Sequence, residues 1–485
     1  MPELSSRLDN RSTPRVGFSS QFTILPNING HLIDLNYKGL SFLVADEIPM
    51  ECMTISLKLF SKKLDLNIKP HWKRRTDKPE EYIYGASILD SNNEVFMQIL
   101  KYMILTKFKD VTKNIKDRKV RKEVLFFSKK VRDYIFKLEE LSNLIQSNNY
   151  SSEQVLSQLS LGTDEIVSLG DNLRSKINDK NLFNRIKKEF RSLASPWAYK
   201  STIVKHSYDK PRGYPGDYET LEVIYDKKII TKKKNIGYFF DLYFLKNPYA
   251  EAVRNRKDML KIDIYNYVNK KNNAIKILNL ASGSCREIRE LINKAGDNFI
   301  NKEILFSCLD WDIESLNFSE NQLKNSPHNI KIEFIREDIL NYIKNRDFFE
   351  KKGQYDFIYS IGLADYLPDR VIKKLIKTSF DGLRSDGVFV LAHKDREKVF
   401  SHLPPEWFCD WVFIPRNQSE TLALFESIGL VGYEYEIRRD QSGDIFFIYL
   451  KKNGIVSPNP TQNGHSTFKT SHNLMNDGQT AGVVS

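Results

Sequence analysis

Apolar and polar residues alternate along residues 16–90, as the positions of Phe42 and Val44 illustrate. Such alternation places successive side chains on opposite faces of an extended strand. An Asn-Gly pair at 29–30 separates two of these runs, and pairs of this kind form tight turns. Several short strands joined by close turns predict a small antiparallel β-barrel over residues 1–93.

The spacing of apolar residues changes after these strands. Val124, Phe127 and Val131 recur at steps of three and four, which is typical of the apolar stripe of an amphipathic helix. Residues 211–216 then carry two prolines and two glycines, which indicates a turn. We therefore predict a helical linker region over residues 94–235.

Strands and helices alternate over residues 236–452, which favours a parallel sheet with helices on both faces. Its most informative segment is ILNLASGSCREIREL (277–291), in which an apolar run stops at Ala281, Ser282 and Gly283 and a helical stripe follows. A strand, a tight turn and a helix N-terminus bring backbone N–H groups close to a nucleotide-like cofactor. Because the turn has a single glycine and no Lys-Ser/Thr pair, it matches neither a dinucleotide fingerprint nor a phosphate-binding loop.

Polar residues follow the next predicted strands in the same way. Asp310 and Asp312 end the second strand, where an acidic side chain can accept hydrogen bonds from ribose hydroxyls. Asp338 follows the third strand, and the fourth strand ends at Ser360 and runs into Gly362. The ordered set places polar groups at the carboxyl edge of the sheet, where such folds bind ligands.

The order of these elements resembles a class I S-adenosylmethionine-dependent methyltransferase. The resemblance extends to a terminal hairpin with an antiparallel last strand at 445–450, which separates this class from dehydrogenase Rossmann folds. More narrowly, the chain resembles a bacterial family of biosynthesis proteins for 3-hydroxypalmitic acid methyl ester, an extracellular signal. The segments that carry this resemblance, which covers about residues 120–452, are KPRGYPGDYE (210–219), YSIGLADYLPD (359–369) and DWVFIPRNQSE (410–420).

The resemblance implies a cofactor contact for each matching residue. Ala281, Ser282 and Gly283 would contact the methionine part of the cofactor, and Asp310 and Asp312 would contact its ribose. Asp338 and Ile339 would flank the adenine. Ser360, Ile361 and Gly362 would line the cofactor on the side that faces the substrate. Arg286 departs from the family, which usually has another glycine at this position. Two interpretations stay open, because Arg286 either pairs with the cofactor's carboxylate or narrows the site.

Methyl transfer to a carboxylate needs little acid–base catalysis, since alignment and exclusion of water supply most of the rate. Arg212 or Arg416 is a candidate for pairing with a substrate carboxylate. Candidates for shaping the pocket are Tyr214, Asp217, Asp365 and Tyr366, and ordinary turn, cap or core roles are the alternative for each. We expect a methyltransferase acting on a small molecule, with the carboxylate of a 3-hydroxy fatty acid as the expected acceptor and residues 94–235 also acting as a substrate cap.

The amino-terminal module resembles a PilZ domain. It contains Arg11 and Arg15 in an RxxxR motif, then Asp34, Asn36 and Gly39 in a motif that usually has serine in place of Asn36. The resemblance implies binding of cyclic di-GMP, since arginines pair with phosphates and guanine edges. A degenerate barrel used only for docking is the alternative.

Composition narrows the remaining possibilities. The formal net charge is +12, and residues 101–136 are rich in Lys and Arg, but no nucleic-acid-reading motif accompanies them. The four cysteines lack metal-ligand spacing, so we predict no metal site. Without an apolar run of membrane-spanning length or a secretory start, we expect a cytoplasmic protein, and we expect residues 453–485 to be a disordered tail.

Two rival functions stay open. One is a non-catalytic cyclic di-GMP effector that binds a protein partner and keeps a silent methyltransferase fold, which the single glycine Gly283 and the unusual Arg286 favour. The other is methylation of a protein or nucleic acid. The second has less support, because SIGLADYL follows the fourth strand where amino-methylating enzymes carry an Asn/Asp-Pro-Pro-Tyr/Phe motif.

Overall fold

The computed structural model describes residues 16–453 apart from short gaps. The gaps are residues 18–20, 25–27, 37, 60–61, 79, 91–92, 272–273, 296–298, 300, 346, 400–403 and 415. The predicted tail therefore lies outside the described residues beyond residue 453, and Arg11 and Arg15 lie outside them as well. Among the described helices, none combines the length and the apolar character needed to cross a bilayer.

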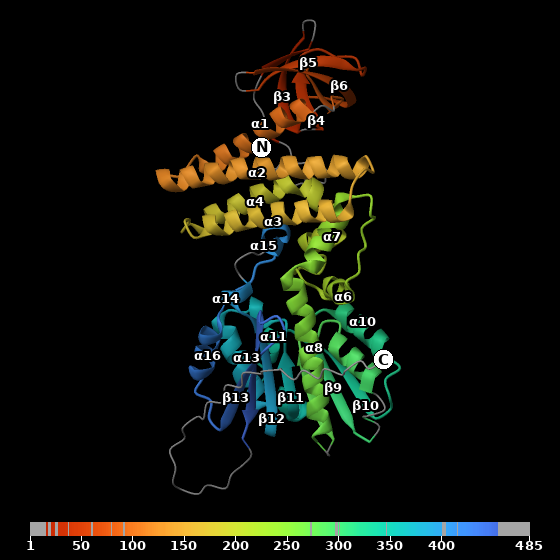
Figure 1. Ribbon diagram of the computed structural model, residues 1–485, viewed down its shortest axis with the longest axis vertical. Coiled ribbons are helices and arrows are strands. Elements are labelled where there is room, and N and C mark those ends of the chain that lie inside the picture. Colours follow the sequence, from red (N-terminus) through yellow and green to blue (C-terminus); the bar gives the residue numbers. More distant parts are fainter. Residues whose placement is uncertain are drawn as a thin grey trace, which may run out of the picture. The chain divides into compact units, whose positions relative to one another are not determined.

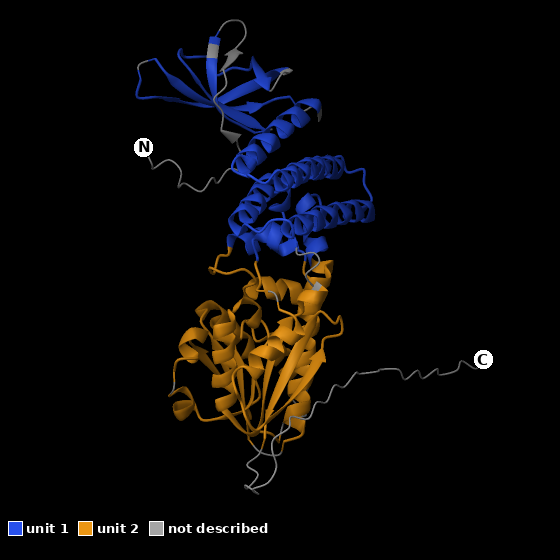
Figure 2. Ribbon diagram, turned by 90° about the vertical axis from the view of Figure 1, so that its left-hand side faces the viewer, with its two compact units in different colours: residues 1–209, 229–244, 402–411 blue, residues 210–228, 245–401, 412–485 orange. Residues whose placement is uncertain are grey.

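The chain forms two compact units, each assembled from segments that are distant in the sequence (Figure 2). Unit 1 comprises residues 1–209, 229–244 and 402–411. Unit 2 comprises residues 210–228, 245–401 and 412–485. The domain boundaries expected from the sequence remain predictions.

The strands of unit 1 form a single antiparallel sheet. Its order is β1-β3-β2-β5-β6-β7-β4, and β4 also pairs with β3, so the sheet curls until its ends meet. The predicted small antiparallel β-structure is therefore confirmed. The turn predicted at Asn29-Gly30 is wrong, because both residues lie within a strand and pair with Thr23 and Phe22 of its neighbour. The strands are β1 (Val16–Gly17), β2 (Gln21–Ile24), β3 (Ile28–Asn36), β4 (Gly39–Val44), β5 (Met53–Leu59), β6 (Lys62–Arg75) and β7 (Tyr82–Ile88).

Long amphipathic helices make up the rest of unit 1. The predicted stripe of Val124, Phe127 and Val131 is buried in the longest of them, α2. Asp117 starts α2 because its carboxylate accepts hydrogen bonds from two backbone N–H groups of the first turn. The helices are α1 (Asn93–Thr112), α2 (Arg118–Gln146), α3 (Ser152–Arg174), α4 (Lys180–Ala198), α5 (Thr202–Asp209), most of α7 (Ile236–Lys246), and α15 (Pro404–Cys409).

Short helix α15 belongs to unit 1 although the segments on both sides of it in the sequence belong to unit 2. Its Trp407 is fully buried, and the ring lies 5.5–5.6 Å from the rings of Phe127, Phe183 and Phe190. Beside it, Glu406 accepts hydrogen bonds from Lys187 at 2.6 Å and Arg174 at 2.5 Å. Aromatic packing and a buried ion pair therefore fix α15 in unit 1.

Unit 2 contains a seven-stranded sheet in the order β10-β9-β8-β11-β12-β14-β13 (Figure 1). Strands β10, β9, β8, β11 and β12 run parallel to one another, and β14 is antiparallel to both of its neighbours, β12 and β13. The predicted parallel sheet and its antiparallel last strand are confirmed. The strands are β8 (Ile275–Leu280), β9 (Ile304–Asp310), β10 (Ile330–Arg336), β11 (Tyr355–Ser360), β12 (Leu383–Lys394), β13 (Tyr433–Arg439) and β14 (Ile445–Lys452).

Separate apolar cores cover the two faces of this sheet. On β8, Ile275 and Ile277 pack in one core, whereas Leu278 and Leu280 pack in the other. Alternation of side chains along the strand explains this division. The surrounding helices are α6 (Tyr218–Asp226), α8 (Pro248–Asn269), α9 (Arg286–Ala295), α10 (Ile313–Leu323), α11 (Ile339–Tyr342), α12 (Phe348–Lys352), the 3₁₀ helix η2 (Ala364–Tyr366), α13 (Asp369–Asp381), α14 (Arg396–Val399) and α16 (Gln418–Glu426).

The order of the strands also locates a ligand site. The chain proceeds from β8 outward to β9 and β10, and then returns to place β11 on the other side of β8. Adjacent connections therefore diverge at the carboxyl ends of β8 and β11. In open α/β sheets ligands bind at such a switch point.

Candidate active site

The turn after β8 is held open by an unusual backbone. Ala281, Gly283 and Cys285 all have positive φ, at 57°, 52° and 49°. The backbone N–H of Ser282 donates to the carbonyl of Leu309 at 3.0 Å, which fastens the turn to the end of β9. Two non-glycine residues in a conformation that favours glycine indicate a turn whose shape is imposed by its surroundings.

Gly283 faces free space and Ser282 has hydrogen-bonding capacity to spare. A Cβ atom placed on Gly283 would meet no described atom within 4 Å. The hydroxyl of Ser282 is buried and has no hydrogen-bond partner among the described residues. A buried polar group without a partner is uncommon, and a bound ligand is one way to satisfy it. The turn therefore fits the approach of a cofactor's polar amino-acid part.

Asp310 lies at the end of β9 and faces this turn. One of its carboxylate oxygens accepts from the N–H of Gly283 at 2.8 Å, and the other accepts from the N–H of Asp312 at 3.0 Å. A carboxylate offers about four lone-pair positions, so each oxygen still has capacity for a ribose hydroxyl. Burial raises the pKa of Asp310, while the backbone N–H groups oppose that shift.

Asp312 has a structural role and also connects the site to residues 210–219. It caps the N-terminus of α10 by accepting from the N–H of Glu314 at 3.0 Å. Its other oxygen accepts from the hydroxyl of Tyr214 at 3.3 Å, and the ring of Tyr214 lies 5.5 Å from that of Trp311. The structure therefore brings the predicted residues Asp310, Asp312 and Tyr214 together.

Arg212 and Asp217 are engaged within the protein. Arg212 forms ion pairs with Glu314 and with Glu219, the latter at 3.0 Å, and its guanidinium lies 4.8 Å from the ring centre of Tyr218. Asp217 is buried and caps α6 by accepting from the N–H of Thr220 at 2.9 Å. Arg212 already has carboxylate partners, and Asp217 performs the cap role that was its alternative.

The remaining predicted cofactor residues lie along the same edge. Asp338 is exposed and caps α11 through the N–H of Leu340 at 2.6 Å, and Ile339 beside it is half-buried. The hydroxyl of Ser360 donates to the carbonyl of Leu280 at 3.1 Å, joining the ends of β11 and β8. Gly362 follows in the next loop and lies against Arg256, since an added Cβ would be 3.5 Å from a terminal guanidinium nitrogen.

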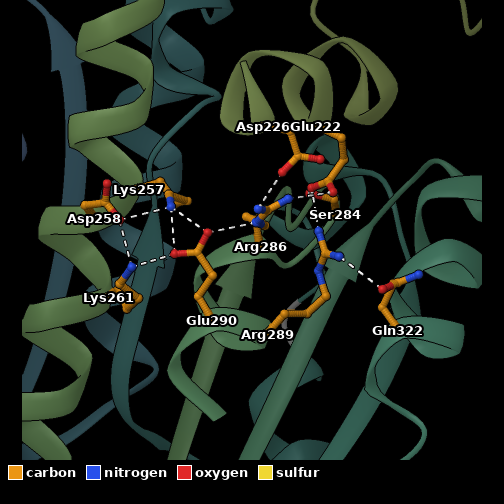
Figure 3. A network of polar contacts seen from close by, with 10 residues as sticks. All are labelled: Glu222, Asp226, Lys257, Asp258, Lys261, Ser284, Arg286, Arg289, Glu290 and Gln322. Atoms are coloured by element: carbon orange, nitrogen blue, oxygen red, sulfur yellow. Dashed lines mark hydrogen bonds and ion pairs between the residues drawn. The ribbon is translucent and has the colours of Figure 1, made fainter. Parts of the chain in front are cut away.

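Arg286 is paired with carboxylates through all three guanidinium nitrogens (Figure 3). It contacts Glu222 at 3.0 Å and Asp226 at 2.7 Å on α6, and Glu290 at 2.8 Å on its own helix α9. Glu222 also accepts from the hydroxyl of Ser284 at 2.6 Å. Arg286 therefore joins α6 to the start of α9, a role that neither sequence interpretation included.

A second polar cluster follows β11. Asp365 is buried and pairs with Lys394 at 2.6 Å. The Lys394 ammonium also lies 4.1 Å from the ring centre of Phe413, whose ring is 5.4 Å from that of Tyr366. Burial opposes ionisation of Asp365, but the charges of Lys394 and His393 lower its pKa to about 2. Burial lowers the pKa of Lys394 to about 8, and Asp365 limits that shift.

This pair makes a testable prediction about pH dependence. Because the pKa of Lys394 falls from 10.5 to about 8 on folding, the unfolded chain binds more protons between these values, and stability rises with pH across that window. Asp365→Asn removes the main charge that keeps this pKa up, so the window should extend below pH 8. Free energies of unfolding measured from pH 6 to 10 test this, and superimposable profiles would contradict it.

Arg416 is engaged in the same region. It donates to Asp369 at 2.6 Å, to the carbonyl of Leu367 at 2.6 Å, and lies 3.2 Å from Nε2 of His393. Arg212 and Arg416, the two arginines that we predicted to pair with a substrate carboxylate, therefore both have partners within the protein.

The predicted cyclic di-GMP residues that the structure describes lie at the β3–β4 turn. Asp34 accepts from the N–H of Ser41 at 3.1 Å, and Asn36 accepts from the N–H groups of Lys38 and Gly39 at 2.8 Å each. Gly39 has a steric reason to lack a side chain, since a Cβ there would lie 2.5 Å from the carbonyl oxygen of Ala86. These three residues shape the turn.

Sequence reasoning missed Arg256, which lies at the site without belonging to any motif. Its position carries a signal nonetheless. On α8 every fourth position from 252 to 264 is buried. Ala252, Leu260 and Ile264 are apolar, and Arg256 occupies the position between Ala252 and Leu260. A cation in the middle of an apolar helical stripe is unusual, because buried charges are normally paired.

Comparison with known proteins gives fold-level likenesses only. No family model and no curated protein matches the chain. It is similar to a possible exported protein from Bordetella parapertussis, at 14% identity over 64% of this chain and 99% of that one, with a TM-score of 0.42. It is also similar to magnesium protoporphyrin IX methyltransferase from Synechocystis PCC 6803 with bound SAM, at 7% identity over 43% and 85%, TM-score 0.31.

A third solved structure to which the chain is similar is the N-methyltransferase NodS from Bradyrhizobium japonicum WM9 in complex with S-adenosyl-L-homocysteine. The identity is 11%, the shares covered are 43% of this chain and 89% of that one, and the TM-score is 0.29. At TM-scores below 0.5, these likenesses assign neither a family nor an activity, so a function must be inferred from the residues of this chain.

Proposed function

We propose that the protein is an S-adenosylmethionine-dependent methyltransferase that acts on a small carboxylic acid, with the carboxylate of a 3-hydroxy fatty acid as the acceptor. The observation that carries this proposal is the pairing of Asp310 with the open turn at Gly283, at the switch point of the sheet. Both the strand order and the carboxylate at the end of β9 agree with the resemblance of the sequence to class I S-adenosylmethionine-dependent methyltransferases.

The residues at this edge fit the proposed cofactor. Asp310 would accept hydrogen bonds from the ribose hydroxyls, Asp338 would accept from the adenine amino group, and Ser282 and Gly283 would adjoin the methionine part. When bound, S-adenosylmethionine supplies an electrophilic methyl group. An ionised carboxylate acceptor requires no base, so the task of the protein is alignment and exclusion of water.

The amino-terminal sheet would make the enzyme responsive to cyclic di-GMP. The turn formed by Asp34, Asn36 and Gly39 supports a PilZ-like module, and Arg11 and Arg15 would supply the positive charge for the phosphates. The competing function is an effector that binds cyclic di-GMP and a protein partner without methylating anything.

Transfer of a radiolabelled methyl group tests this proposal. We expect label from S-adenosylmethionine to enter 3-hydroxypalmitate and related free acids, and not the corresponding primary amides, since the amide lacks the anionic nucleophile. Adding cyclic di-GMP should change the rate. Binding of cyclic di-GMP with neither cofactor binding nor methyl transfer would replace the enzyme with the effector.

A further inference from the structure

Arg256 differs from the other arginines around the site because it has no carboxylate of its own. Arg212, Arg286, Arg289 and Arg416 each form an ion pair within 4 Å. Among the residues that the structure describes, none forms such a pair with Arg256, although Arg256 is only 4% exposed. Its Nε also has no hydrogen-bond partner within the described part of the chain.

None of the described groups around Arg256 pairs with it directly. Tyr225 shares a hydrogen bond with its guanidinium, which supplies a dipole and no full charge. The Lys394 ammonium is a like charge and is paired with Asp365. Glu287 is buried and attracts Arg256 electrostatically, but the two form no ion pair within 4 Å, and burial raises the pKa of Glu287. Its carboxylate already receives hydrogen bonds from Asn279 at 2.9 Å and Tyr359 at 2.7 Å. Arg256 is therefore a buried cation with no directly bound carboxylate, and its guanidinium has capacity for a further anion.

The position of Arg256 places that anion at the site. Its terminal nitrogens lie next to Gly362, in the loop that follows β11 at the switch point of the sheet. Gly362 has no side chain to cover the guanidinium from this direction. Beyond the loop, the Asp365–Lys394 cluster is lined by the rings of Tyr249, Phe413 and Tyr366. A polar anchor beside aromatic rings suits an acid with an apolar chain.

We propose that Arg256 binds the carboxylate of a ligand beside the loop at Gly362. The inference rests on the proposed function, which it deepens by naming the residue that recognises the acid. A planar guanidinium matches a carboxylate through two parallel N–H···O bonds, and a site screened from water strengthens them. Two carboxylates have this chemistry, that of the methyl acceptor and that of the cofactor's amino-acid part.

Anchoring is compatible with methyl transfer to the acceptor. One oxygen of the carboxylate remains on the guanidinium, and the other uses a lone pair to form the new methyl–oxygen bond while the methyl–sulfur bond breaks. The negative charge of the carboxylate and the positive charge of the sulfonium disappear together, so no proton is transferred. The products are the methyl ester and S-adenosylhomocysteine.

Calorimetry and kinetics on Arg256→Gln in the full chain show which carboxylate Arg256 binds, that of the methyl acceptor or that of the cofactor. If the acceptor carboxylate is bound, affinity for S-adenosylhomocysteine should stay within about 3-fold and the KM for 3-hydroxypalmitate should rise roughly 10–100-fold. If the cofactor carboxylate is bound, affinity for S-adenosylhomocysteine should fall by that factor, while affinity for 5′-deoxy-5′-methylthioadenosine, which lacks the carboxylate, stays unchanged. Either result supports the anchor.

Two further variants keep the experiment decisive. Arg256→Lys retains the charge without the planar fork and should show part of the loss, and it serves in place of Arg256→Gln if that variant does not fold. Arg254→Gln is the matched control, since Arg254 lies on the same helix and donates to the carbonyls of Ile224 and Leu245. A folded Arg256→Gln with wild-type affinity and KM would overturn the anchor, whereas a wild-type chain that binds no S-adenosylhomocysteine would overturn the proposed function itself.

Discussion

Replacing Asp310 with Ala is expected to weaken binding of S-adenosylhomocysteine by roughly 100-fold or more. The reason is the number of contacts that depend on one carboxylate. It holds the turn through the N–H of Gly283 and the start of α10 through the N–H of Asp312, and it has capacity left for two ribose hydroxyls. Each hydrogen bond to a charged group contributes about 1.5–3 kcal/mol, so the loss of two corresponds to this factor. Isothermal titration calorimetry measures it.

The affinity for S-adenosylhomocysteine should also depend on pH, because the Asp310 carboxylate titrates. Burial raises the pKa of Asp310, and hydroxyl donors bind the ionised form best. Affinity should therefore be highest above that raised pKa and should fall as the pH falls through it. In Asp310→Ala this part of the pH dependence should disappear.

Asp356→Ala is the matched control for Asp310→Ala. Asp356 is also a strand aspartate that accepts a backbone N–H, from Lys276 at 2.8 Å, and it pairs with Arg384 at 2.8 Å. It lies at the start of β11 and not at the end of a strand. Its removal should lower stability and leave cofactor affinity unchanged. Equal affinities of Asp310→Ala and the wild type would contradict the proposed role of Asp310.

Replacing Glu406 with Ala is expected to lower the free energy of unfolding of unit 1 by about 3–5 kcal/mol. Glu406 and its partner Lys187 each have side chains that are only 4% exposed. Removing the carboxylate would leave the buried ammonium without its counter-charge, and Arg174 would lose its 2.5 Å contact. Urea denaturation followed by tryptophan fluorescence measures the change, because Trp407 is the neighbouring residue.

Two variants show whether burial is the cause. Glu165→Ala breaks a pair within unit 1, with Lys130, in which the two side chains are 62% and 37% exposed, and it should change stability by less than about 1 kcal/mol. The double variant Lys187→Met with Glu406→Leu removes both charges and should recover most of the stability. An effect of Glu406→Ala no larger than that of Glu165→Ala would contradict this explanation.

Local patterns in the sequence were sufficient for most elements of the sheet and for the long helices. The apolar run at β11 and the stripe of α2 are each encoded in one continuous stretch of sequence. The turn at Gly283 and the carboxylate of Asp310 are each marked by the end of a predicted strand. Periodicity and strand-end chemistry depend on neighbours along the chain, which is why they can be interpreted without a structure.

Contacts between distant segments could not be predicted in this way. The partners of Arg286 on α6 lie 60 and 64 positions away, and those of Glu406 lie more than 200 positions away. Ion pairs of this kind leave no periodic trace in the sequence. Arg256 left only a weak signal, a charge in an apolar stripe, and its importance depends on what the fold places around it.

Calorimetric titration of the wild-type chain with S-adenosylhomocysteine tests the central claim most directly. A site built from the turn at Gly283 and the carboxylate of Asp310 should bind one equivalent, with affinity retained in Asp356→Ala and weakened by roughly 100-fold or more in Asp310→Ala. Absence of binding by the folded wild-type chain at ligand concentrations up to about 1 mM would contradict the assignment of this edge of the sheet as a cofactor site.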